Sequence, residues 1–406
     1  MTGLTLFRHP VLGRILWGEL VSALGDGMSM VAVAWLAVQI APPARTGVWT
    51  GLAVAAYALP APIGAALLAR WMRRLGAARL VAMDATLRAV ALGTIATLAV
   101  SGTLTPTVYV LLLAISSLLH AWGSAGTYTL VAELLPPEDR ITGNSLLSTF
   151  NQASYIIGPA LAGGVIALIG AGWVIAVDAG SFAVLAVAAS RVSGRMTVPP
   201  PSASSAGAWR SILDRPRLLG LTALTCVFFF VYGPVEVALP IHVARELHGS
   251  SSLLGFYWTV FGFGATLGAL GARLLRRLPA GLVVSAIVIG WGAALMPVGL
   301  SNAVAPGLIG FGIGGLIYGP FAATTTALFQ ASTPPEMLSR VLAVRYALTT
   351  PSTALGTLLG GPIVGAVGGR NTLLISALFT IGAGITAAAV LGYAAVNRRR
   401  PATVDA

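Results

Sequence analysis

Apolar stretches of 20 or more residues recur along the whole chain, separated by short polar segments. As a helix, a stretch of about 20 residues crosses a hydrocarbon layer of about 30 Å. Because no water satisfies the backbone there, each stretch is predicted to be helical, and the alternation typical of transmembrane β-strands is missing. The pattern predicts an all-α integral membrane protein with twelve transmembrane helices, near 12–40, 48–69, 78–100, 107–132, 142–169, 171–190, 217–244, 252–275, 281–300, 304–330, 341–367 and 371–394.

The composition excludes a water-soluble protein. Hydrophobic residues make up 56% of the 406 positions and charged residues 9%, whereas about a quarter of a soluble domain is charged. A net charge of +12 would suggest nucleic acid as a partner, but the charges lie between apolar stretches, so we exclude that partner. The single cysteine, Cys226, allows no disulfide framework. The first stretch is too long for a cleaved signal and is expected to stay as a span.

The arginines predict the orientation in the membrane. With the N-terminus in the cytoplasm, three arginines fall on the outer side, Arg88 falls inside a span, and twenty fall on the cytoplasmic side, which agrees with the positive-inside rule. An even number of spans returns the C-terminus to the cytoplasm, so we expect a multi-pass protein of the cell membrane. The outer arginines are Arg45, Arg245 and Arg370; the cytoplasmic ones are Arg8, Arg14, Arg70, Arg73, Arg74, Arg79, Arg140, Arg191, Arg195, Arg210, Arg215, Arg217, Arg273, Arg276, Arg277, Arg340, Arg345, Arg398, Arg399 and Arg400.

Two pairs of similar segments indicate a duplicated unit. ARWMRRLGA at 69–77 is similar to ARLLRRLPA at 272–280, and PPEDR at 136–140 is similar to PPEML at 334–338. Both pairs are separated by about half of the chain. Chance similarity between arginine-rich loops is the alternative to a duplication.

A hydrophilic segment divides the predicted helices six and six. This segment, 192–216, contains PPPSASSAGA, whose composition is typical of an unstructured linker. We therefore expect an N-terminal six-helix bundle over 1–191, a cytoplasmic linker over 192–216, and a C-terminal six-helix bundle with a short cytoplasmic tail over 217–406. Both halves start inside, so the repeat is parallel, with a central cavity between the halves.

Several stretches carry a resemblance to a known family. The twelve helices, the six-plus-six repeat and the basic loop after the second helix resemble the major facilitator superfamily over the whole chain. More narrowly, the sequence resembles the drug:proton antiporter branch that contains macrolide-efflux and enterobactin-exporter proteins. The stretches are ALGDGMSMVAVAW at 23–35, MDATLRAV at 83–90, PPEDRITGNSLLSTFNQASYIIGPALAGG at 136–164 and VDAGSFAV at 177–184. The resemblance implies the major facilitator fold and proton-coupled efflux of a drug or siderophore-like metabolite.

The resemblance also implies a cytoplasmic gate at the two basic loops. In the family an Asp precedes the basic residues and helps to latch the gate, but Ala69 stands at that position and Ala272 stands at its counterpart. This departure puts the latch in doubt, and a purely topological role of the arginines is the alternative. The candidate gate residues are Arg70, Arg73, Arg74, Arg273, Arg276 and Arg277.

The fifth predicted span resembles the exporter signature of the family. It contains Gly158, Pro159, Gly163 and Gly164. Ser154, Gly158 and Ala162 are small residues spaced by four, which lets a second helix approach closely, and Pro159 bends the span. We predict a helix-packing motif here, with ordinary tight packing as the alternative to a hinge.

Two acidic residues inside the spans are candidates for proton coupling. A charge near the centre of a bilayer costs roughly 2.5–3.5 kcal/mol, so Asp26 and Glu236 each need a partner, a watery cavity or a function. The functional hypothesis is a carboxyl that takes up and releases a proton, and the alternative is an acid bonded to a neighbouring helix. Asn151, Gln152 and Tyr155 are candidates for the same cavity, because contact with lipid would penalise their polar groups.

The remaining charges inside the spans are predicted to be structural. Asp84 and Arg88 are four residues apart, the spacing of a salt bridge on one helix face. Asp178, in the sixth span, is predicted to hold helices together. Glu19 is expected to reach the cytoplasmic interface. His120 could relay a proton, although a lone membrane histidine is more often simply hydrogen-bonded.

The sequence contains no motif for an enzyme, a metal or a cofactor. No phosphate-binding G-x-x-x-x-G-K-[ST] is possible without lysine, and no Cys/His metal cluster or activated nucleophile is present. An ion gradient is then the remaining energy source, and the prediction is a monomeric secondary transporter whose partners are a small molecule, protons and the lipid bilayer. Two alternatives stay open: an importer or uniporter of a polar solute, and a membrane protein that transports nothing.

Overall fold

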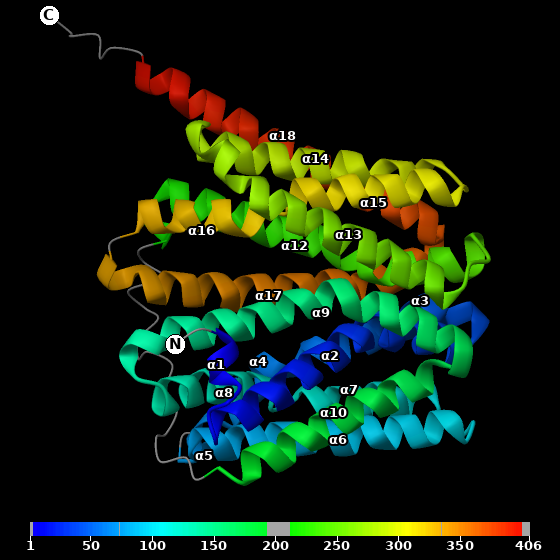
Figure 1. The fold of residues 1–406 in the computed structure, drawn as a ribbon. Coiled ribbons are helices and arrows are strands. Elements are labelled where there is room, and N and C mark those ends of the chain that lie inside the picture. The colour runs from blue at the N-terminus through cyan, green and yellow to red at the C-terminus, as the bar shows by residue number, and fades with distance from the viewer. Residues whose placement is uncertain (1–2, 73, 193–211, 334, 400–406) are drawn as a thin grey trace, which may run out of the picture. The chain divides into compact units, whose positions relative to one another are not determined.

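The computed structural model describes the chain except residues 1–2, 73, 193–211, 334 and 400–406 (Figure 1). The elements of the described residues are all helical. They are α1 (Gly3–Leu6), α2 (Leu12–Ile40), η1 (Pro43–Arg45), α3 (Thr46–Ala58), α4 (Pro60–Leu67), α5 (Ala69–Met72), α6 (Ala77–Val100), α7 (Pro106–Ser117), α8 (His120–Leu134), η2 (Pro137–Asp139), α9 (Arg140–Ile169), α10 (Ala171–Ser190), α12 (Pro216–Ile241), η3 (His242–Glu246), α13 (Ser251–Gly271), η4 (Ala272–Arg277), α14 (Ala280–Leu300), α15 (Val304–Tyr318), α16 (Phe321–Ser332), α17 (Pro335–Val367) and α18 (Gly369–Arg399).

The predicted all-α membrane class is confirmed. Within the described residues, eleven helical stretches are long and apolar enough to cross a membrane. The remaining predicted span, 341–367, lies within α17, a helix of 33 residues that carries Arg345 and the polar stretch TTPST at 349–353. Some predicted spans consist of two helices in series: α3 gives way to α4 at Pro60, and α15 to α16 at Pro320. Proline lacks the N–H that would continue the helix, which explains both breaks.

The chain divides into two compact units. The first comprises Met1–Ala203, Glu236–Thr259 and Thr357–Gly369. The second comprises Ser204–Val235, Val260–Gly356 and Arg370–Ala406. The predicted division into 1–191, 192–216 and 217–406 stays a prediction, and most of the predicted linker lies outside the described residues.

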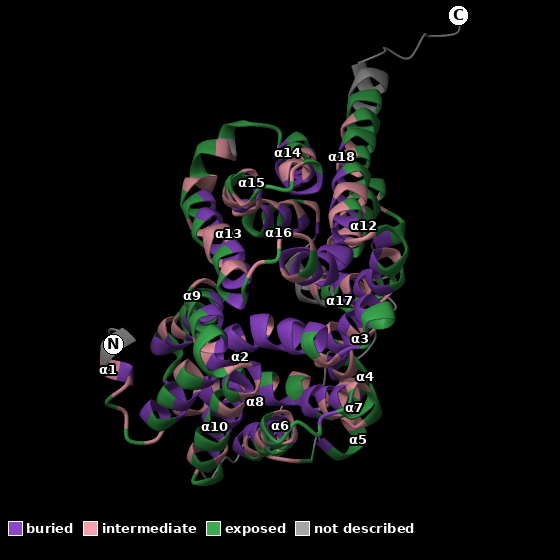
Figure 2. Cartoon of the chain, turned by 90° about the vertical axis from the view of Figure 1, so that its right-hand side faces the viewer, coloured by how far each residue is buried: buried purple, intermediate pink, exposed green. Residues whose placement is uncertain are grey.

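In the first unit, α2 packs against both α9 and α10, and most of its residues are buried (Figure 2). Glycine makes this close approach possible. A Cβ atom on Gly27 would lie 2.3 Å from the carbonyl oxygen of Ser154 on α9. A Cβ atom on Gly25 would lie 2.3 Å from the carboxylate of Asp178 on α10. The sequence of α2 therefore brings polar groups of its neighbours within reach of its own.

The glycines of the predicted packing motif on α9 differ in whether they contact another helix. A Cβ atom on Gly158 would lie 2.4 Å from the backbone of Gly27, and one on Gly163 would lie 2.9 Å from Cα of Ser252 on α13. At Gly164, no described atom outside the helix lies within 4 Å of that position. Gly158 and Gly163 thus sit in helix contacts, whereas Gly164 faces open space.

We expect Gly158→Ala to destabilise the protein by about 1–3 kcal/mol, because the methyl group would press on backbone atoms that cannot move aside. Gly164→Ala, on the same helix, is the matched control and is expected to leave stability unchanged or slightly raised, because alanine favours helix over glycine. Thermal unfolding of the purified protein in detergent measures both. Equal melting temperatures for the two variants would contradict the close contact between α2 and α9.

The second unit has an aromatic core. Trp291 of α14 is buried against Phe261, Phe311 and Tyr318. A second cluster joins α12, α16 and α17 through Leu218, Phe329, Val341 and Val344. These contacts fix the side of α17 that carries Arg345.

Candidate functional site

The candidate site is a group of charged side chains in the interior of the first unit. Asp26 of α2 accepts a hydrogen bond from Nη1 of Arg88 on α6 at 2.8 Å and from the hydroxyl of Tyr57 on α3 at 2.6 Å. The side chain of Arg88 is 3% exposed, whereas that of Asp26 is 33% exposed. The guanidinium of Arg88 is therefore shielded from solvent, whereas the carboxylate of Asp26 is partly accessible to it.

Arg88 is also flanked by two aromatic rings. Its guanidinium carbon lies 4.6 Å from the ring centre of Phe182 on α10 and 5.5 Å from that of Tyr57. A cation over a ring face is attracted by the ring's negative face. No described residue accepts a hydrogen bond from Nε of Arg88. Asp26 is thus the main counter-charge of this arginine.

The predicted ion pair between Asp84 and Arg88 is wrong. Among the described residues, Arg88 pairs with Asp26 instead, while a carboxylate oxygen of Asp84 lies 3.8 Å from Nδ1 of His120 on α8. Gly123 of α8 leaves the space in which the Asp84 carboxyl sits, since a Cβ atom there would lie 2.1 Å from it. Spacing by four along a helix allows a salt bridge, but the packing of neighbouring helices decides which partner is used.

Asp178 of α10 is fully buried and bonded to hydroxyl groups. Ser29 of α2 donates to one carboxylate oxygen, and Ser181 donates to the other at 3.3 Å. The carboxylate thereby ties α10 to α2. This position suits a structural acid, and the role itself stays a prediction.

Glu19 makes a contact to α8 that the sequence does not predict, and its reach to the cytoplasmic interface stays a prediction. It is half-buried on α2, and the hydroxyl of Thr127 on α8 donates to its carboxylate at 2.6 Å. It interacts electrostatically with Asp84, Asp26 and His120. Glu19 and Asp26 are seven residues apart and so lie on one face of the same helix.

Three of the five predicted cavity residues come together in the first unit. Tyr155 of α9 interacts electrostatically with both Asp26 and Glu236. The carboxylate of Glu236 on α12 accepts a hydrogen bond from the hydroxyl of Thr357 on α17 at 3.2 Å. Asn151 and Gln152 are exposed on α9, about one turn before Tyr155. Tyr155, which is 57% exposed, is therefore near two acids that are 210 positions apart in the sequence.

A second polar cluster, also in the first unit, was not predicted from the sequence. Arg245 of η3 donates to the carbonyl oxygen of Pro43 at 3.0 Å and to the hydroxyl of Thr46. Glu246 contacts His242 on its own helix and accepts a hydrogen bond from the backbone N–H of Gly369 at 2.7 Å. Only the spacing of His242 and Glu246 is visible in the sequence. The cluster lies at the helix ends predicted to face outward, so we refer to it as the outer cluster.

The predicted latch at the gate arginines stays untested. Arg70, Arg74, Arg273 and Arg277 are exposed, and the side chains of Arg73 and Arg276 lie outside the described residues. Both predicted roles, gate and topology, stay predictions.

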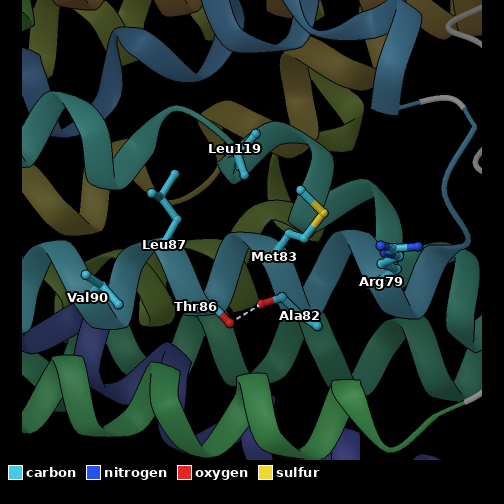
Figure 3. A pocket seen from close by; sticks show the side chains of 7 residues that line it. All are labelled: Arg79, Ala82, Met83, Thr86, Leu87, Val90 and Leu119. Atoms are coloured by element: carbon cyan, nitrogen blue, oxygen red, sulfur yellow. Dashed lines mark hydrogen bonds between the residues drawn. The ribbon is translucent and has the colours of Figure 1, made fainter.

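A cavity of about 430 Å³ runs along one face of α6 (Figure 3). Its walls are mostly apolar, and the hydroxyl of Thr86 is turned back to the carbonyl oxygen of Ala82 at 2.7 Å. Val90 at its edge is 63% exposed. This groove suits contact with lipid chains better than a polar site. No cluster of metal ligands occurs among the described residues.

Comparisons with known proteins agree with this architecture. The family model described as Major Facilitator Superfamily matches residues 15–315. The multidrug efflux pump Tap of Mycolicibacterium fortuitum is 26% identical, covering 94% of this chain and 95% of that protein. The multidrug efflux pump Tap of Mycobacterium tuberculosis is 29% identical, covering 92% and 91%.

Solved transporter structures share the fold at low sequence identity. The nucleoside transporter NupG has a TM-score of 0.71 at 13% identity, covering 93% of this chain and 98% of that one. A bacterial homolog of the human lysosomal transporter Spinster, in an inward-facing and unoccupied conformation, has a TM-score of 0.70 at 13% identity, covering 94% and 96%.

Proposed function

Because this chain belongs to the major facilitator superfamily, it is a transporter, and we propose that it exports a small amphipathic or hydrophobic compound in exchange for protons. One observation carries the proposal: Asp26 is bound by Arg88 and Tyr57 inside the first unit, yet its side chain is 33% exposed. In this proposal a proton reaches the partly exposed carboxylate and, once bound, weakens its attraction to Arg88. The helices α2 and α6 would then move relative to each other.

The energetics suit a coupled exporter. One charge that moves through about 100 mV releases about 2.3 kcal/mol, which sustains a concentration ratio of roughly 50. The names of the relatives in Mycolicibacterium and Mycobacterium support efflux. We propose that export proceeds by alternating access in the cell membrane, with both termini cytoplasmic, and that the outer cluster closes the outward side.

Inverted membrane vesicles test this function. Vesicles containing the protein are energised by respiration and given ethidium, rhodamine 123 and rhodamine 110, with vesicles lacking the protein as the blank. We expect uptake of at least one dye, collapse of uptake by a protonophore, and no dependence on sodium. Uptake that survives the protonophore would exclude proton coupling, and uptake only by right-side-out vesicles would favour the importer.

The variant Glu236→Gln tests which of the two candidate acids, Asp26 or Glu236, couples transport to protons. Glu236 is bonded to the hydroxyl of Thr357 and to no described arginine, so we expect its neutralisation to leave proton-driven accumulation within about threefold of wild type. Uptake rates in the same vesicles measure this. If Glu236→Gln abolishes accumulation while Asp26→Asn does not, the coupling role belongs to α12 and not to α2.

A further inference from the structure

The second unit contains a buried arginine whose surroundings differ from those of Arg88. Arg345 of α17 is 6% exposed. Its Nη2 donates to the hydroxyl of Thr325 at 2.9 Å and its Nη1 to that of Thr326 at 3.2 Å, both on α16. Its guanidinium carbon lies 5.0 Å from the ring centre of Phe329 and 5.7 Å from that of Tyr346. The sequence predicts Arg345 on the cytoplasmic side, near the start of the predicted span 341–367; the structure buries it against α16.

Arg345 has no counter-charge among the residues that the structure describes. The described ion pairs of the protein do not include it. The one acidic side chain described in the second unit is Asp214, which is exposed just before α12. The side chains that interact electrostatically with Arg345 are those of Tyr346, Tyr318 and Cys226, none of which is a carboxylate. Arg88, by contrast, has a carboxylate at 2.8 Å.

An unpaired buried cation is costly. Desolvation of an ion in a protein interior costs several kcal/mol even after relaxation, and rings and neutral hydroxyl groups return only part of it. A guanidinium presents five N–H donors in a fixed fork that fits carboxylate and phosphate. Nη1 and Nη2 of Arg345 are held by the hydroxyl groups of Thr326 and Thr325, so the orientation of the guanidinium is fixed before a ligand binds.

We propose that Arg345, with Thr326, forms a binding site for the anionic group, a carboxylate or a phosphate, of an amphipathic ligand. The hydroxyl of Thr325 is committed, since it donates to the carbonyl oxygen of Phe321 at 2.7 Å. The hydroxyl of Thr326 accepts from Arg345 and can donate its own hydrogen to a ligand oxygen. This inference rests on the proposed function, for which it names the substrate class.

Access to Arg345 lies beside Tyr346. That side chain is 62% exposed although its ring lies next to the guanidinium. The guanidinium of Arg345 therefore lies next to a side chain that reaches the protein surface, and we infer that a ligand approaches on this side.

Equilibrium binding of two matched dyes tests the proposal. Rhodamine 110 carries a free carboxylate, and rhodamine 123 is its methyl ester. Fluorescence anisotropy of each dye with the purified protein, in phosphatidylcholine nanodiscs, gives the two Kd values. We expect the wild type to bind rhodamine 110 about tenfold more tightly than rhodamine 123, the effect of one charge-assisted contact. In Arg345→Gln the preference should fall below about twofold, and Arg345→Lys should keep part of it.

A control variant and the melting temperature distinguish anion binding from a purely structural role of Arg345. Arg217→Gln removes an exposed arginine at the start of α12 and should keep the full preference. If Arg345 only fastens α17 to α16, Arg345→Gln lowers the melting temperature but leaves both Kd values unchanged, and the proposal is overturned. It is equally overturned if the wild type binds both dyes alike and gains no thermal stability from phosphatidylglycerol.

Phosphatidylglycerol in the nanodiscs identifies the source of the anion. If a lipid phosphate occupies the site, this lipid removes the rhodamine 110 preference and raises the melting temperature of the wild type but not of Arg345→Gln. If a soluble substrate occupies it, the preference persists. Both results support an anion site. Because binding is measured without a gradient, failure of proton-driven transport and failure of this inference are separate results.

Discussion

Asp26→Asn is expected to lower the accumulation of dye in energised inverted vesicles from roughly 50-fold to roughly onefold. Asparagine keeps the size of the side chain and can still accept from Tyr57 and Arg88, but it cannot take up or release a proton. The free energy of the proton gradient then no longer drives the transport cycle. Exchange of dye down its own gradient should persist, because the helix contacts around Asp26 remain.

Two measurements on the same vesicles decide this prediction. Accumulation is followed with the gradient on and off, and exchange is followed with dye loaded on both sides. Asp214→Asn, which neutralises an exposed carboxyl before α12, is the matched control and should accumulate dye as the wild type does. Accumulation by Asp26→Asn at the wild-type level would remove Asp26 from the coupling mechanism.

The transmembrane spans were predictable because a helix in lipid needs about 20 consecutive apolar residues, and such stretches are visible in the sequence. The first stretch, 12–40, coincides with α2, and 171–190 coincides with α10. The break between α7 and α8 at Leu118–Leu119 was not predicted. Ser116 and Ser117 precede the break and His120 follows it, but hydropathy along a span does not show where the helix axis changes direction.

The candidate site was predictable only in part, because the sequence of one helix does not show which side chains of a neighbouring helix it will contact. Asp26 and Arg88 were singled out because a charge in a span is expensive, but their pairing depends on the approach of α2 to α6. The contact of Glu246 with the N–H of Gly369 joins positions far apart in the chain, and no local pattern signals it. Arg345 lies about ten residues from the start of α17, near a predicted loop, so its burial follows only from the packing of α16.

Arg88→Gln is expected to have the second large effect, a loss of stability of about 3 kcal/mol. Removal of one partner from a buried pair leaves an uncompensated charge, which costs about 3–5 kcal/mol when both partners are buried. The lower end applies because Asp26 is 33% exposed. The double variant Asp26→Asn, Arg88→Gln should regain more than half of the loss, because it removes the charge that Arg88→Gln leaves unpaired.

Thermal unfolding in detergent of the wild type, both single variants and the double variant completes this thermodynamic cycle. Arg79→Gln, which removes an exposed arginine from the same helix, should melt like the wild type and shows the cost of losing a surface charge from α6. Additive losses in the double variant would mean that Asp26 and Arg88 contribute independently. Arg88 would then act through the rings of Tyr57 and Phe182, and protonation of Asp26 could not release α6 from α2.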